Sequence, residues 1–155
     1  DPDRFREILV TGQAGYLLDS HVLIWSLYQR SKLPPRYRPV LEGEAPSWIS
    51  AATVWEIEIK KKVGRLAIPH AIWSQVVEVG HRFIAIGQAH AIEAARLPVH
   101  HGDPFDRMLI AQAPSEGLTI LTVDRAFAAY DVSQQLWLCP ALMRFRKRAQ
   151  ESAAS

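Results

Sequence analysis

Short, uninterrupted apolar runs alternate along this chain with longer segments in which apolar positions recur at helical spacing. The runs, closed by polar or small residues as is typical of buried strands, span 15–20, 47–50, 83–87 and 118–124. The segments between them predict helices at 21–28, 51–64, 71–82, 89–98 and 103–113. Because apolar strands separated by helices indicate a parallel sheet covered on both faces, we predict an α/β fold with three layers, α/β/α.

Local signals mark the ends of these helices. Ser50 is the expected N-cap of 51–64, and Gly64 is its terminator. Pro98 halts the helix at 89–98. Asp103 precedes Pro104, and because proline favours the first helical position, Asp103 is the expected N-cap of the last helix.

Composition changes this picture little. A chain of 155 residues, 48% apolar and 22% charged, is expected to form one globular domain. It shows no signal peptide and no apolar stretch long enough to span a membrane, so we expect a cytoplasmic protein without a membrane partner. The single cysteine, Cys139, fits a reducing compartment. A net charge of +2 and a pI of about 8.9 permit a nucleic-acid partner without indicating one.

Four acidic residues are expected at one edge of the sheet. In open parallel sheets the binding crevice lies beyond the carboxyl ends of the strands. Asp19 and Asp124 each end a predicted strand, Asp106 lies in the first turn of the last helix, and Glu56 lies about two turns into 51–64. Simpler explanations exist for the last two: Asp106 complements the helix dipole, and Glu56 pairs with Lys60.

The neighbouring Glu58 points elsewhere and is expected to pair with Lys62.

Converging carboxylates repel one another, which raises their pKa values and costs stability. A divalent cation removes this penalty, and ligands that are all oxygen favour Mg²⁺ or Mn²⁺ over Zn²⁺. Such an ion polarises a phosphate oxygen and lowers the pKa of a water molecule for attack on it. The residues alone therefore indicate a metal-dependent phosphodiesterase.

Five segments in order resemble the PIN-domain ribonuclease toxins of VapBC toxin–antitoxin modules: YLLDSHVLIW, ISAATVWEIEIKKKVGRL, LPVHHGDPFDRMLIAQA, EGLTILTVD and FAAYDV. The resemblance covers roughly residues 16–138. It implies a PIN fold, cleavage of RNA with Mg²⁺ or Mn²⁺, a cognate antitoxin that blocks the site, and a homodimer. We expect the PIN domain at 16–140, an N-terminal extension or a remnant of cloning at 1–15, and a basic C-terminal tail at 141–155.

The resemblance also implies roles for particular residues. It places the catalytic positions at Asp19, Glu56, Asp106 and Asp124. Of these, Asp19, Asp106 and Asp124 are expected to hold the metal ion. Asp103 is expected to cap the helix, and whether it also contributes to the site stays open.

Substrate contacts are expected from a small set of polar and basic residues. Ser20 also matches a hydroxyl position that orients the first aspartate, and the arginines that follow Asp106 and Asp124 are equally suited to pairing with a neighbouring carboxylate. The set is Ser20, Lys60, Arg65, Arg107 and Arg125. One departure from the family is Pro114, which is expected to end or kink its helix one turn early.

Two other functions compete with the nuclease. One is a catalytically silent PIN-like module that binds RNA or a protein partner, although the presence of all four acidic positions argues against it. The other is a phosphatase for small phosphoesters, although Ser20 and His21 stand where a second aspartate is expected after Asp19.

Histidines and tryptophans offer further alternatives. A zinc site formed by His100, His101 and Asp103 lacks a fourth ligand. The other histidines are expected at the rim or in the core (His21), or at ordinary surface or helix positions (His70, His81, His90). The tryptophans are expected to pack in the core or a dimer interface rather than to stack on bases; they are Trp25, Trp48, Trp55, Trp73 and Trp137.

Overall fold

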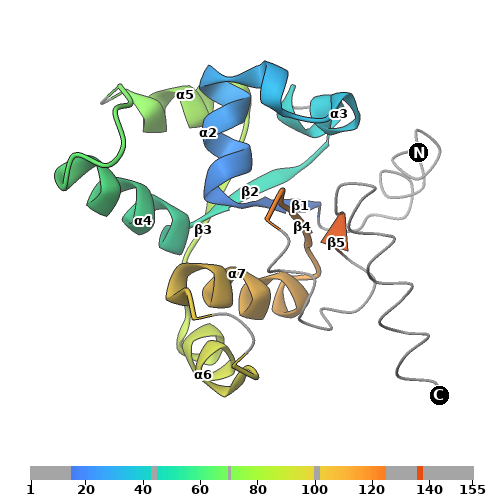
Figure 1. Ribbon diagram of the computed structural model, residues 1–155. Coiled ribbons are helices and arrows are strands. Elements are labelled where there is room, and N and C mark those ends of the chain that lie inside the picture. The colour runs from blue at the N-terminus through green and yellow to red at the C-terminus, as the bar shows by residue number, and fades with distance from the viewer. Residues whose placement is uncertain (1–14, 43–44, 70, 100–101, 125–135, 138–155) are drawn as a thin grey trace, which may run out of the picture.

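A five-stranded parallel sheet forms the centre of the molecule (Figure 1). The computed structural model describes residues 15–42, 45–69, 71–99, 102–124 and 136–137. The strands are β1 (Tyr16–Leu18), β2 (Ser47–Ser50), β3 (Arg82–Ile84), β4 (Thr119–Leu121) and β5 (Leu136–Trp137). Their order across the sheet is β3-β2-β1-β4-β5. In the central pairs, Leu17 lies beside Trp48 of β2 and Ile120 of β4.

Helices cover both faces of the sheet, which confirms the predicted three-layer α/β/α class (Figure 1). The longer ones are α2 (Ser20–Tyr28), α4 (Ala51–Lys62), α5 (Ile72–Val79), α6 (Gln88–Arg96) and α7 (Pro104–Ser115), and α3 (Arg38–Leu41) is a single turn. Helices α2, α4 and α5 lie on one face, and α6 and α7 lie on the other. Within the described part of the chain, no helix has both the length and the apolar character of a membrane span.

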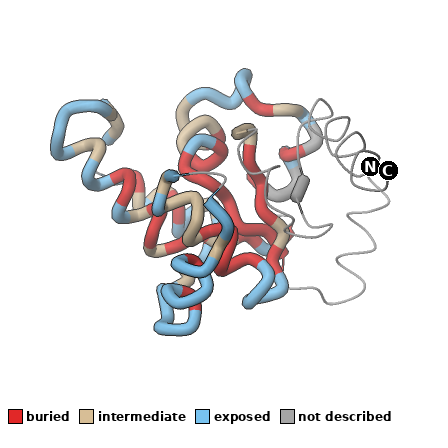
Figure 2. Tube along the Cα trace, turned by 60° about the horizontal axis from the view of Figure 1, so that its bottom comes forward, coloured by how far each residue is buried: buried red, intermediate tan, exposed pale blue. Residues whose placement is uncertain are grey.

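Alternation along the strands divides the core into two layers. Successive side chains of a strand point to opposite faces. Tyr16 and Leu18 therefore pack with the helices of one face, whereas Leu17 packs with Leu109 and Ile110 of α7 on the other. Figure 2 shows this buried centre as a continuous inner region with exposed helix surfaces around it.

Some boundaries differ from the sequence prediction. The helix expected at 71–82 ends at Val79, because Gly80 takes a left-handed conformation with φ of 102° and reverses the chain into β3. Helix α7 continues one residue beyond Pro114, so the proline lies in its last turn. The short helical turns at 30–32, 35–37 and 38–41 and the strand β5 were not predicted.

The strand order places a change in chain direction next to the central strand. From β1 the chain moves outward through β2 to β3, and it then returns by way of α6 and α7 to β4 on the other side of β1. The connections that leave β1 and lead into β4 therefore lie on opposite faces. Ligands of open parallel sheets bind at such a point, beyond the carboxyl ends of the strands.

Gly15, at the entry to β1, allows a test of this core. Its φ is 106°, and a Cβ added there would lie 2.4 Å from the Pro46 carbonyl oxygen. We expect Gly15→Ala to lower the free energy of unfolding by about 2 kcal/mol or more, because backbone strain and a steric clash act together. Gly64→Ala is the control: it has a φ of 74° but open space around it, and should cost about 1 kcal/mol. Equal losses in urea unfolding would contradict the steric argument.

Candidate functional site

Asp19 lies at the carboxyl end of the central strand and begins the next helix. It is the N-cap of α2, where its Oδ1 accepts a hydrogen bond of 2.8 Å from the Val22 N–H. Its Oδ2 accepts from the hydroxyl of Thr122, and its backbone N–H donates to the Leu121 carbonyl at 3.1 Å. The carboxylate is thereby fixed beyond the carboxyl end of β1, beside β4, while only 2% of the residue is exposed.

The environment of Asp19 disfavours its charge. Burial raises the pKa of this carboxyl to about 6, and the hydrogen bonds from Thr122 and Val22 oppose the rise. The negative charges of Asp124 and Glu56 raise the pKa further. Asp124 and Glu56 are therefore both near enough to act on the charge of Asp19.

Thr122 is a site residue that the sequence analysis missed. It is fully buried, and its hydroxyl accepts a hydrogen bond of 3.0 Å from the Asp124 N–H while donating to Asp19. One hydroxyl thus ties together the chain segments that carry two of the acidic residues. Thr122 directly follows β4, which pairs with β1, and the sequence holds no signal for that neighbourhood.

Glu56 reaches the same region from α4. Ser50 caps this helix as predicted, accepting a hydrogen bond of 3.0 Å from the Ala52 N–H. Glu56 is only 4% exposed, and its Oε2 accepts a hydrogen bond of 2.9 Å from the Lys60 ammonium. Glu56 therefore forms the simple helical pair with Lys60 and is also buried.

Asp103 and Asp106 lie beside Glu56 at the start of α7. Oxygen atoms from these three carboxylates lie within 4.8 Å of one another. Asp103 is also the N-cap, with its Oδ1 accepting from the N–H groups of Phe105 at 2.8 Å and Asp106 at 3.3 Å. The predicted cap is confirmed, and the structure adds that the capping carboxylate belongs to the acidic group.

Glu56 connects the two parts of the arrangement. It groups with Asp103 and Asp106 by distance, and it acts on Asp19 through its charge, together with Asp124. We name these five residues the acidic cluster. All of its donors are carboxylate oxygens, which suits a hard divalent cation.

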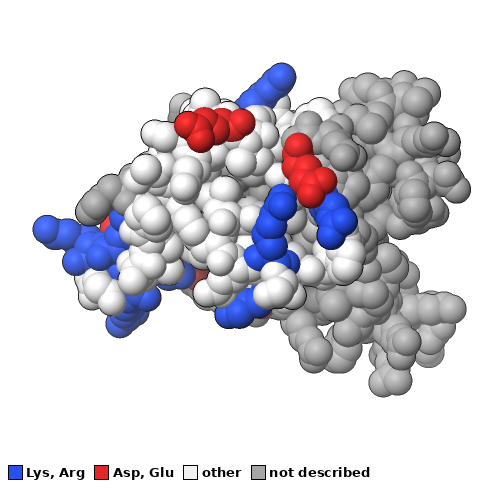
Figure 3. Space-filling model, turned by 90° about the horizontal axis from the view of Figure 1, so that it is seen from above, with Lys and Arg blue, Asp and Glu red and all other residues white. Residues whose placement is uncertain are grey.

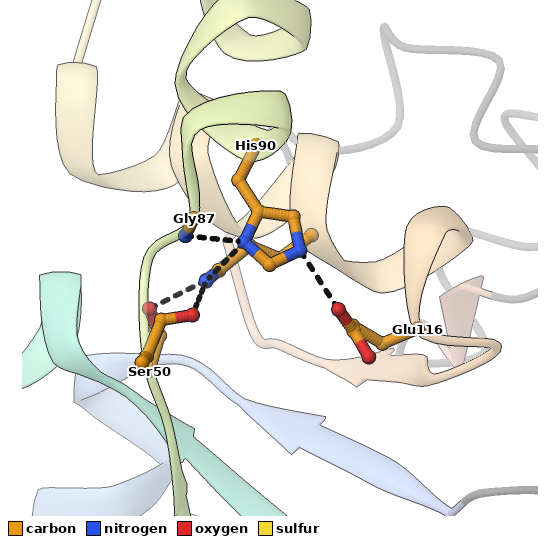
Figure 4. Close-up of polar contacts among 6 residues, drawn as sticks. Ser50, Gly87, His90 and Glu116 are labelled. Atoms are coloured by element: carbon orange, nitrogen blue, oxygen red, sulfur yellow. Dashed lines mark hydrogen bonds and ion pairs between the residues drawn. The ribbon is translucent and has the colours of Figure 1, made fainter.

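A buried polar network fixes α4 relative to α7 (Figure 4). The Gln112 side chain of α7 accepts a hydrogen bond of 2.5 Å from the Ser50 hydroxyl and donates to the Ala85 carbonyl at 3.2 Å. Its amide nitrogen also lies 3.5 Å from Nδ1 of His90. Since Ser50 begins the helix of Glu56, and Gln112 lies on the helix of Asp106, this network sets how the two acidic residues meet.

His90 completes the network. The Gly87 N–H donates to its Nδ1 at 3.0 Å, so Nε2 carries the proton and donates to Glu116 at 2.8 Å. The expectation of an ordinary surface or helix position was wrong for His90 and also for His81, which are only 8% and 4% exposed. Burial lowers the pKa of His81, whose Nδ1 bonds the Ser47 hydroxyl.

The expected substrate residues occupy different environments. The Arg107 guanidinium donates to the carbonyls of Ala94, Leu97 and Pro98, where α6 ends, so it joins α6 to α7. Ser20 is buried in the first turn of α2, and Arg65 is exposed beyond α4. Their contacts with substrate stay predictions.

Other predicted residues lie outside the described part of the chain. They include Arg125, His70, His100, His101 and Cys139.

One local expectation was wrong. Glu58 pairs with Lys61 at 3.0 Å rather than with Lys62, and its carboxylate also accepts from the Trp73 indole at 2.8 Å. Trp55 lies outside the core of the chain, 63% exposed with an edge contact to Phe105, so a place in a dimer interface stays a prediction for it.

The other tryptophans with described side chains are partly buried against the core, as expected; they are Trp25, Trp48 and Trp73.

Parallel strand order, with acidic side chains beyond the carboxyl end of the central strand, defines the class of this α/β protein. The family model of the PIN domain matches residues 16–133, so this chain belongs to the PIN-domain family. Within that class the chain is similar to Ribonuclease VapC22 of Mycobacterium tuberculosis. The two are 30% identical over 117 residues, which cover 74% of this chain and 90% of that protein. The predicted resemblance to VapC-type proteins is confirmed.

Solved structures share the fold. VapBC2 from Rickettsia felis, bound to a DNA fragment from its promoter, aligns with a TM-score of 0.59 at 14% identity, over 81% of this chain and 97% of the other. A toxin–antitoxin complex from Klebsiella pneumoniae aligns with a TM-score of 0.52 at 19% identity, over 80% and 95%.

The raised pKa of Asp19 predicts how stability depends on pH in metal-free protein. Because the folded-state pKa of about 6 exceeds the ordinary 3.8, the folded form binds the proton more tightly. The stabilisation that comes from this proton is complete below pH 3.8 and is lost as the pH rises through 6. The free energy of unfolding falls by about 3 kcal/mol over this range. Asp19→Asn keeps a capping oxygen and lacks this charge. We expect the variant to be more stable than wild type at pH 7.5, with the difference vanishing near pH 4.

Urea unfolding in EDTA at several pH values measures this difference. A difference in stability that does not vary with pH would contradict the assignment of the buried charge to Asp19.

Proposed function

We propose that this protein is an endoribonuclease and the toxin of a toxin–antitoxin module, and that it cleaves RNA phosphodiester bonds with the help of Mg²⁺ or Mn²⁺. The observation that carries the proposal is the acidic cluster, in which Glu56, Asp103 and Asp106 lie within 4.8 Å of one another and Asp19 feels the charges of Glu56 and Asp124. The relative Ribonuclease VapC22 and the toxin–antitoxin complexes that share the fold support the activity and the biological role.

The residues of the cluster fit a divalent cation. Burial, with a further contribution from the charges of Asp124 and Glu56, raises the pKa of Asp19, and a bound cation would offset both effects. Asp19, Asp106 and Asp124 are the proposed ligands, Glu56 completes the catalytic set, and Asp103 adds negative charge beside it. When bound, the ion supplies a positive charge that lowers the pKa of an attacking water and polarises the phosphate.

The protein's own groups prepare the site. Thr122 and the Val22 N–H hold the Asp19 carboxylate in one orientation, and the first N–H groups of α7 hold the Asp103 carboxylate. The Ser50–Gln112 contact keeps the two acidic helices together. Acidic groups that are already oriented need little rearrangement when the substrate binds, which favours the transition state.

Basic residues at the end of α4 are the proposed contacts for the RNA backbone. Figure 3 shows Lys and Arg side chains gathered where α4 ends, next to a face with few charges. The residues there are Lys60, Lys61, Lys62 and Arg65. Positive charge beside an acidic metal site is suited to binding phosphates. We propose the same role for Ser20, Arg107 and Arg125.

Protein partners are part of the proposal. We propose a cognate antitoxin, a homodimer, and action in the cytoplasm by a PIN domain spanning 16–140. Three apolar side chains along α4 and at its C-cap support a protein partner: Trp55, Ile59 and Val63 follow one another at intervals of about one turn and are 63%, 39% and 61% exposed.

Cleavage of RNA tests the activity. We expect purified protein to cut structured RNA in Mg²⁺ or Mn²⁺, EDTA to stop the reaction, and Asp106→Asn to lower the rate by about 100-fold or more, because loss of an ion-holding carboxylate removes several kcal/mol of stabilisation. Glu58→Gln is the matched control, since Glu58 lies on α4 outside the cluster and its variant should keep the activity. Sequencing of the fragments identifies the cleaved bonds.

Two outcomes would contradict the proposal. Binding of RNA without metal-stimulated cleavage would favour a silent PIN-like module. Hydrolysis of p-nitrophenyl phosphate with RNA left intact would favour a phosphatase.

Substitution of Asp103 separates capping from metal binding. Asp103→Ala should lower the free energy of unfolding by about 1 kcal/mol because the cap is lost, whereas Asp103→Asn keeps a capping oxygen and the stability. Both remove a negative charge and should weaken Mn²⁺ binding by about tenfold. Titration calorimetry and urea unfolding measure the two effects. Wild-type affinity in Asp103→Asn would limit this residue to the cap.

A further inference from the structure

Lys60 connects the acidic cluster to the solvent. It lies one turn after Glu56 on α4, and its ammonium is 2.9 Å from Glu56 Oε2. The Glu56 side chain is only 6% exposed, whereas that of Lys60 is 41% exposed. The charged end of a mobile side chain is therefore bound to a carboxylate that lies almost entirely inside the protein.

The next lysine provides a contrast. Lys61 pairs with Glu58 at 3.0 Å, but the Glu58 side chain is 47% exposed and is also bound by the Trp73 indole. The Lys61 side chain is only 11% exposed, but the carboxylate that it pairs with is half exposed, so solvent screens the negative charge of this pair. Glu56, in contrast, lies within 4.8 Å of the Asp103 and Asp106 oxygens, where solvent screens its charge poorly. Of these two neighbouring pairs, only the Lys60 pair places a positive charge in the acidic cluster.

An ammonium and a divalent cation compete for the same negative charge. A cation held by Asp106 would lie close to Glu56, because oxygen atoms of the two carboxylates lie within 4.8 Å of each other. The Lys60 ammonium is 2.9 Å from Glu56, so the two positive charges would be a few ångströms apart and would repel strongly. The four-carbon stem of lysine is flexible, and its outer part already reaches solvent. The ammonium can therefore move outward into solvent without a steric clash.

We propose that Lys60 is a built-in competitor for the divalent cation. Its ammonium neutralises Glu56 when the cation is absent and moves outward when the cation binds, so that Lys60 stabilises the metal-free protein and lowers the metal affinity. In its outward position the ammonium is available to an RNA phosphate, which couples loading of the ion to binding of the substrate. This inference rests on the proposed function, because it requires that the acidic cluster bind a cation.

Mn²⁺ titration by calorimetry and thermal unfolding in EDTA test the proposal on wild type and three variants. We expect Lys60→Met to bind Mn²⁺ about tenfold more tightly, which corresponds to about 1.4 kcal/mol. Without metal, it should melt about 3 °C lower than wild type, and saturating Mn²⁺ should remove this difference. Lys61→Met, which removes the same charge one residue away, should stay within about twofold of the wild-type affinity, and Lys60→Arg should resemble wild type.

The outcomes distinguish this inference from the proposed function. If wild type and all three variants fail to bind Mn²⁺, the metal-dependent function and the role of Lys60 are both overturned. If wild type binds Mn²⁺ but Lys60→Met binds it equally or more weakly, or no differently from Lys61→Met, the competitor role alone is overturned.

Discussion

Repulsion among buried carboxylates is the constraint on which the rest of this structure depends. Asp19 follows the central strand, where solvent is nearly excluded, and the charges of Glu56 and Asp124 act on it there. A fold that gathers such groups must either neutralise them or hold them by hydrogen bonds. Both solutions are present: Thr122 and the Val22 N–H bind Asp19, and Lys60 binds Glu56.

The acidic residues also serve the fold. Asp19 begins α2 and Asp103 begins α7, each with a side-chain oxygen on backbone N–H groups of the first turn. The free N–H groups of a helix start attract negative charge. The same electrostatic feature thus stabilises two helices and fixes the orientation of two carboxylates of the acidic cluster. Function and local stability favour the same residue type at these positions.

Much of the fold could be predicted from the sequence, because its signals are local. Apolar runs marked four of the strands, Pro104 located the α7 cap, and the rule for parallel sheets placed Asp19 and Asp124 at one edge. Contacts between distant segments left no such signal. The Thr122 hydroxyl on Asp19 and the Ser50–Gln112 contact depend on which strands and helices are neighbours, and that order could not be derived from periodicity.

The choice between core and dimer interface for Trp55 stayed open in the sequence for a related reason. Its helix is apolar on more than one side, and spacing alone does not say which side meets the sheet. The end of α5 at Gly80 was not predicted, because a glycine within a helical pattern ends the helix only when the backbone reverses there. Its φ of 102° shows that the backbone does so.

The contact between Thr122 and Asp19 spans 103 positions of the chain. During synthesis on the ribosome, the first carboxylate emerges long before the hydroxyl that orients it, and β1 lacks its neighbour β4 until then. Contacts so distant in sequence form late in folding. A nascent chain is therefore expected to remain harmless to the RNA of the cell that makes it until nearly the whole domain has been translated.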